Sequence, residues 1–237
     1  MPHYSLYFLF LIAIVACKDQ NPTPAQSEVI DTSTHLDTME SVTQLDLAPI
    51  SIDYDTTLWT EISIADGILL DLRYATTDNF TLSQIYPCGR CFLRPAVAKR
   101  LLHLNEKIKA EKNYQFKLYD CYRPRPAQQR LWDKHPNPTH VMHPSKGSMH
   151  NRGAAVDLTL VVIDSGQELD MGTDFDYFGR EARHDYTGHN DFVLTNRTYL
   201  RRLMEEAGFK SIKSEWWHYS LSGQRSALSS WEWPCPD

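Results

Sequence analysis

The sequence lacks an excess of positive charge. Its 237 residues include 24 Lys and Arg against 30 Asp and Glu, so the formal net charge is −6. Proteins that bind nucleic acid neutralise phosphates with clustered basic side chains, and this chain contains no basic stripe. The short arginine clusters at 180–183 and 201–202 are mixed with acids and are interpreted as solvated faces. The charge pattern therefore excludes nucleic acid as a partner.

A long hydrophobic run is also missing. Residues 4–16 form thirteen mostly apolar positions, whereas a membrane-spanning helix needs about 20. The run suits the apolar region of a signal peptide, and it ends in Ile14-Val15-Ala16-Cys17, which resembles a bacterial lipobox. We therefore expect residues 1–17 to be a lipoprotein signal and Cys17 to carry acyl chains that anchor the protein to a membrane.

A lipoprotein of this kind would lie outside the cytoplasm, facing the periplasm or the cell exterior. The region before the apolar run carries little positive charge, because it contains only the initiator amine and His3. An ordinary cleaved signal or a membrane-embedded helix therefore remains the alternative.

Residues 18–55 lack a sustained apolar period. They are rich in Pro, Thr, Ser and Asp, and such a composition buries too little apolar surface to offset the entropy of ordering. We predict a flexible linker over 18–55, followed by a single domain over 56–237. Its 180 or so residues suffice for one hydrophobic core, and no internal repeat divides them.

The cysteines do not form a recognisable metal or redox motif. Cys88-Gly89-Arg90-Cys91 has no second Cys-x-x-Cys to complete a zinc site, and its flanks differ from a thioredoxin-like entry. If Cys17 is acylated, the other four cysteines form an even set in an oxidising compartment, where disulfides are expected. They are Cys88, Cys91, Cys121 and Cys235. Three connectivities are possible, and the sequence leaves them open.

Helical and extended periods are both present in the domain. Residues 95–112 carry apolar side chains at helical spacing with a proline in the first turn. Further helices are expected over 126–134 and from about 195 to 207, the latter ended by a glycine. Extended segments are expected over 115–119, 156–163 and 209–219. Because strands and helices do not alternate regularly, we predict an α+β fold with helices packed on a central, largely antiparallel sheet.

Two segments about sixty residues apart carry a set of zinc ligands. Residues 148–157 supply His150 and Asp157, and Glu215-Trp216-Trp217-His218 supplies His218. Two histidines and one carboxylate are a usual protein complement of a catalytic zinc, which keeps its fourth position open. Asp157 interrupts an apolar run, and a buried carboxylate is costly unless it is paired or binds a metal. A nearby arginine or several N–H donors could pair it instead, but the accompanying histidines favour the metal.

The same segments supply candidates for catalysis. Glu215, three residues before His218, can take a proton from water and pass it to a leaving amine. Arg123 carries a permanent positive charge that can stabilise an oxyanion. Trp216 and Trp217 are adjacent, so a strand would place their rings on opposite faces. We expect one ring in the core and one, Trp217, against the substrate. The loop 184–189 contains two histidines but is interpreted as a polar loop without a metal.

Five segments resemble those of a known enzyme family, the D-alanyl-D-alanine dipeptidases of the VanX type. The similarity extends from about Leu58 to Trp233, and the five segments follow in the family's order. The resemblance implies a zinc D-Ala-D-Ala peptidase with a fold that the family shares with Hedgehog signalling domains. The segments are LRYATTDNF, YDCYRP, SMHNRGAAVDLTL, MGTDFDYF and EWWHY.

The resemblance also implies roles for single residues. His150, Asp157 and His218 match the zinc ligands, Glu215 matches the catalytic base, and Arg123 matches the arginine that stabilises the tetrahedral intermediate.

Three further positions match residues that surround the substrate in this family. Ser148 and Asp176 match substrate contacts, Asp176 being the partner of the free amino group. Asp120 matches an acid that helps to hold the site. Cys121 departs from the family, which usually has Gly or Ala there, so its redox state could perturb Arg123.

Three functions compete on this evidence. The first is hydrolysis of the dipeptide D-Ala-D-Ala in cell-wall peptide turnover. The second is a zinc D,D- or L,D-carboxypeptidase that acts on peptidoglycan stem peptides, and the third is a zinc-binding module without activity. Glu215 and Arg123 disfavour the third, because a binding module needs neither a base nor an oxyanion partner. The segment 171–178 favours the dipeptidase over the carboxypeptidase.

Overall fold

The computed structural model describes residues 52–236. The expected signal over 1–17, the acylated Cys17 and almost all of the expected linker over 18–55 lie outside the described residues. Within the described part of the chain, no helix combines the length and the apolar character that a membrane crossing requires.

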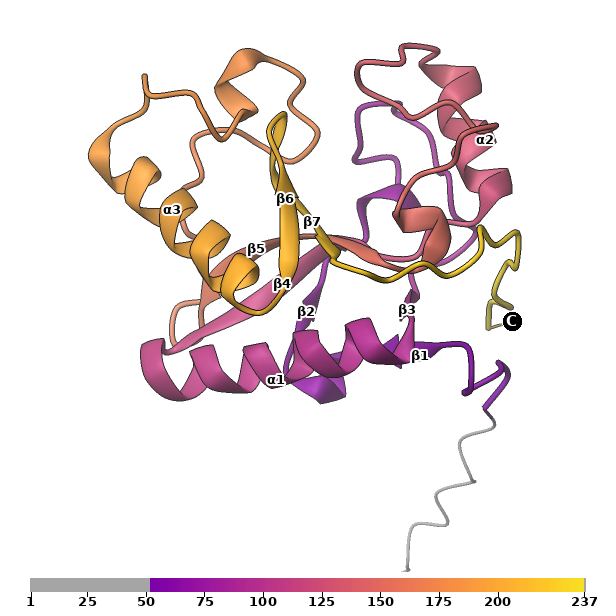
Figure 1. The fold of residues 1–237 in the computed structure, drawn as a ribbon, viewed down its shortest axis with the longest axis horizontal. Helices are drawn as coiled ribbons and strands as arrows, with labels where there is room; N and C mark the ends of the chain where they lie inside the picture. Colours follow the sequence, from indigo (N-terminus) through magenta and orange to yellow (C-terminus); the bar gives the residue numbers. More distant parts are fainter. Residues whose placement is uncertain (1–51, 237) are drawn as a thin grey trace, which may run out of the picture. The chain divides into compact units, whose positions relative to one another are not determined.

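The described residues form a mixed α+β fold (Figure 1). A five-stranded sheet has the order β2-β4-β5-β7-β6, in which β2 runs parallel to β4 and the other neighbours are antiparallel. A second sheet pairs β1 with β3 in antiparallel orientation. The predicted fold class is confirmed. The bounds are β1 Thr60–Ile62, β2 Leu69–Leu70, β3 Cys91–Leu93, α1 Pro95–Lys112, β4 Tyr114–Asp120, α2 Arg125–Lys134, β5 Ala155–Val162, α3 Asp191–Glu206, β6 Phe209–Ile212 and β7 Glu215–Leu221.

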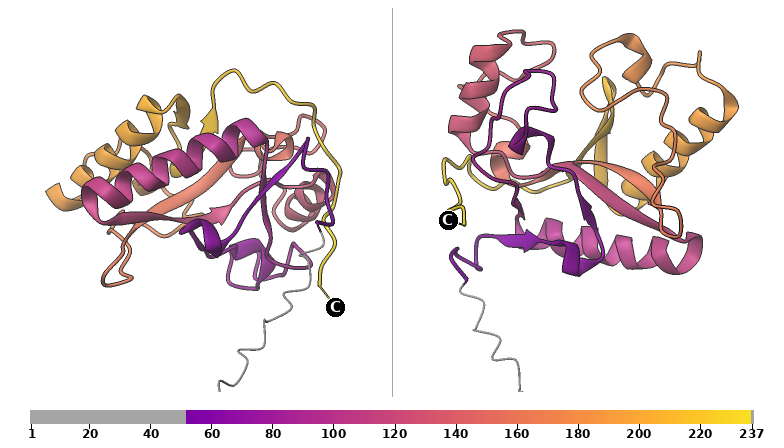
Figure 2. Two further views of the ribbon diagram at one scale, coloured as in Figure 1. Left: turned by 90° about the horizontal axis from the view of Figure 1, so that it is seen from below. Right: turned by 180° about the vertical axis from the view of Figure 1, so that it is seen from behind.

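Two of the helices pack on the larger sheet, and the third lies apart from them. Helix α1 packs against β4, while α3 packs against β6 and β7 (Figures 1 and 2). Helix α2 follows β4 and lies away from α1 and α3, at the upper right of Figure 1. The chain between α2 and β5 returns to the sheet through a short 3-10 turn, His150–Arg152. This return places polar side chains where β5 and β7 meet.

The expected helices are present, with differences at their ends. Helix α1 has the predicted bounds, and its apolar residues are buried at the predicted spacing. Helix α3 begins at Asp191, four residues before the expected start, because the side chain of Asn190 accepts a hydrogen bond of 3.0 Å from the Val193 amide and caps it. The expected extended segment 209–219 is divided into β6 and β7, which form an antiparallel pair.

Strand β5 lies at the centre of the larger sheet. Its residues from Ala155 to Val161 are buried, as expected for a strand with neighbours on both sides and layers on both faces. Asp157 is the one charged residue in this strand and is 3% exposed. Its burial requires a partner that can compensate the charge.

Two disulfides resolve the cysteine pairing that the sequence left open. Cys88 bonds to Cys235, and Cys91 bonds to Cys121. The first ties the C-terminal segment to the loop before β3. That segment also buries Trp233, whose ring packs at 5.2 Å from Tyr86. The second ties β3 to the residue that follows β4, so the loop carrying Arg123 is held at its start.

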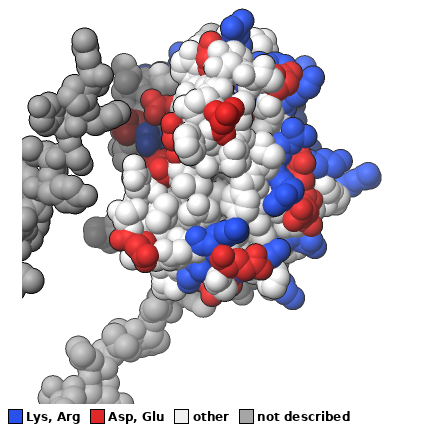
Figure 3. Space-filling model, turned by 90° about the vertical axis from the view of Figure 1, so that its left-hand side faces the viewer, with Lys and Arg blue, Asp and Glu red and all other residues white. Residues whose placement is uncertain are grey.

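Charged side chains of both signs occur on the surface. On the side seen in Figure 3, Lys and Arg side chains are interspersed with Asp and Glu. The arginine clusters noted in the sequence carry such pairs, because Arg201 contacts Glu205 at 2.9 Å and Arg183 contacts Asp185 at 2.9 Å. The pairs are exposed, so each contributes little to stability.

Candidate metal centre and active site

Three buried side chains converge where β5 and β7 meet. Asp157 on β5 and His218 on β7 are directly paired in the antiparallel register, so their side chains point to the same face of the sheet. His150 reaches them from the 3-10 turn before β5. The exposed fraction is 3% for Asp157, 8% for His218 and 3% for His150. They form the one group of three potential ligands found among residues 52–236.

The distances within this group fit a tetrahedral metal. The Oδ1 atom of Asp157 lies 3.0 Å from Nδ1 of His218 and 3.3 Å from Nε2 of His150, and the two nitrogens are 3.0 Å apart. A tetrahedral zinc with bonds of about 2.0–2.2 Å would separate its ligand atoms by about 3.3 Å. The three atoms therefore have the spacing that a zinc ion requires.

The hydrogen bonding of His150 also fits a ligand role. Its Nδ1 atom lies 2.7 Å from the carbonyl oxygen of Cys121, and a carbonyl only accepts, so Nδ1 must carry the proton. In the neutral ring, Nε2 then presents its lone pair to the group. In metal-binding histidines, the ring nitrogen that does not bind the metal usually donates a hydrogen bond of this kind, which fixes the tautomer.

The alternative partners for Asp157 are not used. Its Oδ1 atom contacts the two histidines, and neither an arginine nor a set of amides pairs with it among the described residues. Burial alone would raise the pKa of Asp157, but the charge and hydrogen bonds of His150 and His218, when these rings are protonated, hold that pKa below its usual range. The carboxylate is therefore ionised and available as a ligand.

A cavity of about 460 Å³ opens beside the three ligands. The sequence-predicted residues that line it, besides the ligands, are Arg123, Ser148, Asp176, Glu215 and Trp217. Four chain segments supply these residues: the loop after β4, the loop before β5, the loop before α3, and β7. The cavity therefore brings together residues that are up to about ninety positions apart in the chain.

Glu215 is a carboxylate in the wall of this cavity. It is the first residue of β7, three positions before His218. Burial raises the pKa of Glu215 to about 7. A general base works best when its pKa lies near the working pH, and burial shifts the pKa of Glu215 in that direction. A bound cation would lower this pKa and favour the ionised form.

Arg123 is fixed by neighbours that hold its plane. Its Nε and Nη2 atoms donate to Oδ2 of Asp120 at 3.1 and 2.6 Å, and Nη1 donates to Gln128 at 3.0 Å. Its guanidinium also lies 5.1 Å from the ring centre of Tyr74. Burial would lower the pKa of Arg123, but Asp120 keeps it raised, so the group remains charged.

Asp120 acts behind the cavity wall. It is 0% exposed, and its Oδ1 atom accepts a hydrogen bond of 2.7 Å from the hydroxyl of Tyr86. Its other oxygen holds Arg123 and lies 3.5 Å from Nδ1 of His150. The role of Asp120 as an acid that holds the site stays a prediction, and the residue is fully buried and is not among those that line the cavity.

Asp176 presents a second carboxylate to the cavity. Its backbone is in the left-handed region, with φ of 59°, which is uncommon for a residue other than glycine and is often found at functional sites. Its Oδ2 atom accepts a hydrogen bond of 2.8 Å from the hydroxyl of Tyr74. Burial raises the pKa of Asp176 to about 8. An incoming ammonium group would restore its negative charge, since an opposite charge favours the ionised form.

Tyr74 lines the cavity but was not predicted from the sequence to be a site residue. It lies in the segment 72–80, whose likeness to the dipeptidases was visible, but 102 positions separate it from Asp176. Phe178 and His140 are further cavity residues of this kind, and their rings stack at 4.2 Å. No sequence pattern predicts that these two rings stack.

The two adjacent tryptophans lie on opposite faces of β7, as expected. Trp217 lines the cavity, while Trp216 donates from Nε1 to Thr173 Oγ1 at 2.9 Å and lines a different pocket. Both are buried, at 1% and 2% exposed. A substrate contact by Trp217 stays a prediction, and its place in the cavity wall is consistent with it.

The comparisons with known proteins agree over most of the chain. The sequence model of the Peptidase M15 family, described as D-ala-D-ala dipeptidase, matches residues 56–234. A D-alanyl-D-alanine dipeptidase of Escherichia coli (strain K12) is 36% identical over 172 residues, covering 70% of this chain and 86% of that protein. The D-alanyl-D-alanine dipeptidase of Enterococcus faecium is 33% identical over 191 residues, covering 72% of this chain and 94% of that protein.

Proposed function

This chain belongs to the D-Ala-D-Ala dipeptidase family of M15 peptidases, and we propose that it hydrolyses free D-Ala-D-Ala to two D-alanines with one zinc ion per chain. The convergence of His150, Asp157 and His218 beside a cavity that holds Glu215 and Arg123 carries this proposal. The turnover of cell-wall peptides is the process in which such an activity would act.

Each residue has a separate part in the proposed reaction. A zinc ion between His150, Asp157 and His218 would supply acidified water and a polarised carbonyl. Glu215 takes the proton of the attacking water and gives it to the leaving amine. Arg123 offers a fixed positive charge to the oxyanion that develops, and Asp120 keeps its guanidinium in position.

Asp176 favours a dipeptidase over a carboxypeptidase. A free dipeptide carries an ammonium group that can pair with the Asp176 carboxylate, whereas a stem peptide has an uncharged amide at the same place. An acylated amine would leave the desolvated carboxyl without its charged partner, which is costly. A binding module without activity is further disfavoured, because Glu215 and Arg123 both line the cavity.

The proposed specificity predicts a strong preference for an unblocked amine. We expect the protein to cleave D-Ala-D-Ala and to leave N-acetyl-D-Ala-D-Ala nearly intact. The contact with Asp176 alone is worth about 1.5–3 kcal/mol, which is roughly a ten- to a hundredfold preference. Asp176→Ala should lose this part of the preference, as measured by kcat/KM for the two peptides.

Asp174→Ala provides the matched control for this comparison. Asp174 lies on the same segment but is exposed and lines a different pocket, so its removal should not alter the preference. Efficient release of D-Ala from the blocked peptide by the parent would contradict the dipeptidase and support the carboxypeptidase. An unchanged preference in Asp176→Ala would contradict only the role of that residue.

We further propose that the mature protein is a lipoprotein anchored through Cys17 and facing the periplasm or the cell exterior. The apolar run and the Ile14-Val15-Ala16-Cys17 sequence support this location. An enzyme outside the cytoplasm does not reach the cytoplasmic pool of D-Ala-D-Ala directly. Salvage of wall-derived dipeptide is therefore the physiological role we favour over glycopeptide resistance.

Cys17→Ser should abolish acylation. We expect the parent to fractionate with membranes and to have an intact mass that includes acyl chains at Cys17. The variant should be released or remain unprocessed, because the thiol that accepts the lipid is missing. A mature parent chain without lipid, free in the periplasm of the native cell, would contradict the anchor.

A further inference from the structure

Arg197 on α3 is a buried arginine for which the proposed reaction has no use. It is 5% exposed, and burial lowers its pKa to about 10. No ion pair joins it to a carboxylate within residues 52–236. Its hydrogen bonds go to backbone carbonyls, and its guanidinium lies 6.0 Å from the ring centre of Trp216. A charged group buried in this way is costly unless its donors are satisfied. The carbonyls satisfy Nε and Nη1, while Nη2 has no hydrogen-bond partner among the described residues.

The carbonyls held by Arg197 lie on both sides of Asp176. Nε donates to the carbonyl of Met171 at 2.6 Å, and Nη1 donates to the carbonyls of Glu181 at 2.8 Å and Arg183 at 3.2 Å. Asp176 is five positions from Met171 and five from Glu181. One guanidinium thus joins the two ends of the loop that presents Asp176 to the cavity.

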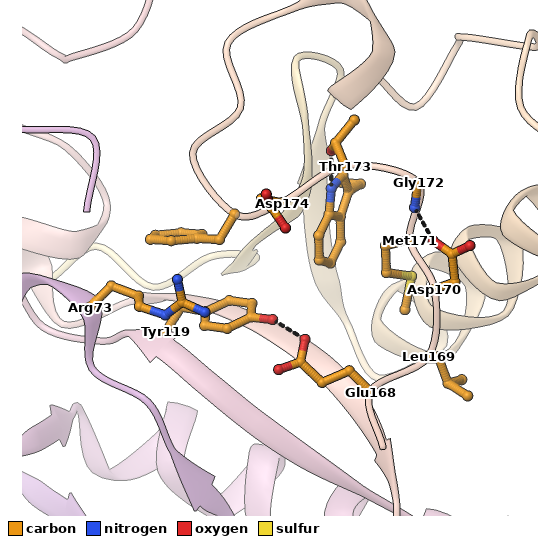
Figure 4. Close-up of a pocket in the computed structure, with 11 residues that line it drawn as sticks. Arg73, Tyr119, Glu168, Leu169, Asp170, Met171, Gly172, Thr173 and Asp174 are labelled. Atoms are coloured by element: carbon orange, nitrogen blue, oxygen red, sulfur yellow. Dashed lines mark hydrogen bonds between the residues drawn. The ribbon is translucent and has the colours of Figure 1, made fainter. Parts of the chain in front are cut away.

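The first end of this loop is packed closely against α3. Asn196, beside Arg197, donates to the carbonyl of Asp170 at 2.9 Å. Gly172 has φ of +77°, and a Cβ atom there would lie 2.6 Å from the ring of His189 and 2.7 Å from Val193. Figure 4 shows the segment from Glu168 to Asp174 lining the pocket that contains Trp216, with the Gly172 amide donating a hydrogen bond to the Asp170 side chain.

The second end is held by the same helix and by the turn before it. His189 Nε2 lies 2.8 Å from the carbonyl of Glu181, which also accepts from Arg197. Between the two ends, Phe175 is buried and its ring lies 5.5 Å from that of Trp217. The left-handed backbone of Asp176 therefore occurs in a loop whose ends and middle are all fixed.

We infer that Arg197 is a positioning residue for substrate recognition: it holds the loop 171–181 so that Asp176 meets the amino group of the dipeptide. Lysine at this position would keep the charge but could not bridge carbonyls on both ends, since its single ammonium lacks the planar fork. Loss of the bridge would move the Asp176 carboxylate and weaken binding, while Glu215, Arg123 and the metal ligands keep their places. The inference rests on the proposed function.

The test compares steady-state kinetics of zinc-loaded parent and Arg197→Lys on D-Ala-D-Ala. We expect KM to rise by about tenfold or more, as for loss of a charge-assisted hydrogen bond, with kcat within about threefold of the parent. KM does not depend on the fraction of folded enzyme, so a merely structural role would lower the apparent kcat and leave KM unchanged. Arg201→Lys, an exposed arginine on the same helix, is the matched control and should retain the parent KM.

Two further variants link the effect to Asp176. Asn196→Ala releases the Asp170 carbonyl from α3 and should also raise KM, by a smaller factor. If Arg197→Lys does not fold, this variant still tests the inference. In an Asp176→Ala background, Arg197→Lys should raise KM no further, because residues that act through one group are not additive.

The outcomes separate this inference from the proposed function. A parent that does not cleave free D-Ala-D-Ala would overturn both. If the parent is active, two outcomes would overturn the positioning role alone. One is an unchanged KM in Arg197→Lys, and the other is an equal rise in KM when Arg197→Lys is made in the parent and in the Asp176→Ala background.

Discussion

Glu215→Gln is expected to keep its metal and to lose turnover. The amide has nearly the shape of the carboxylate but cannot accept the proton of the attacking water, and loss of a positioned base lowers kcat by about 10² to 10⁴. The zinc ligands His150, Asp157 and His218 are unchanged, so metal content should stay at one ion per chain. Elemental analysis and the rate of D-Ala-D-Ala hydrolysis, measured on one preparation, check both parts.

Glu206→Gln is the matched control for this substitution. Glu206 is exposed on α3, so its replacement makes the same chemical change away from the cavity and should leave kcat unaltered. Loss of zinc from Glu215→Gln would reassign Glu215 to the metal centre. Activity within a few-fold of the parent would remove it from catalysis.

Arg123→Lys is expected to lower kcat by about 10² to 10³, the usual cost of removing an oxyanion donor. The three donating nitrogens of Arg123 are fixed by Asp120 and Gln128. A lysine ammonium carries the same charge but cannot reproduce this planar arrangement. It would also leave the buried Asp120 with fewer hydrogen bonds. Steady-state kinetics on D-Ala-D-Ala, with zinc content measured alongside, gives the result.

Arg125→Lys is a control from the same stretch of chain. Arg125 begins α2 and is exposed, so the substitution should be nearly silent. If Arg123→Lys kept near-normal kcat with zinc bound, the role of Arg123 would be structural. A drop in the thermal midpoint with unchanged kcat would point the same way.

Local patterns predicted the three helices and the extended segments that form β4 to β7, but not β1, β2 or β3. The spacing of Val97, Leu101 and Ile108 predicted α1 with its observed bounds, because one helical face is buried. His150, Asp157 and His218 were visible because their residue types stand out beside apolar runs. The antiparallel pairing of Asp157 with His218 was found only in the structure.

Other parts of the site depend on contacts between distant segments. The bond between Tyr74 and Asp176 joins residues 102 positions apart, and no local period indicates it. The pairing of Cys91 with Cys121 was one of three possibilities and became definite only when β3 and β4 were placed. Arg197 lies on the buried face of α3, where its charge breaks the helical pattern without showing which carbonyls it would hold.

The N-terminal end of α3 was not predicted correctly from the sequence. The helix was predicted to begin at about residue 195, whereas it begins at Asp191 and is capped by Asn190. The first turn contains Phe192, which is 82% exposed and does not continue the buried face. The cap, rather than the apolar pattern, defines this helix end.

The most direct measurement for the central claim is a titration of metal-depleted protein with zinc, followed by the rate of D-Ala release from D-Ala-D-Ala. We predict no turnover without metal, a linear increase to one zinc per chain, and no further increase beyond it. His218→Ala should recover little activity at the same zinc concentration, because one of the three ligands is missing. Full activity in the metal-depleted protein, or saturation in the parent at other than one zinc per chain, would contradict the account.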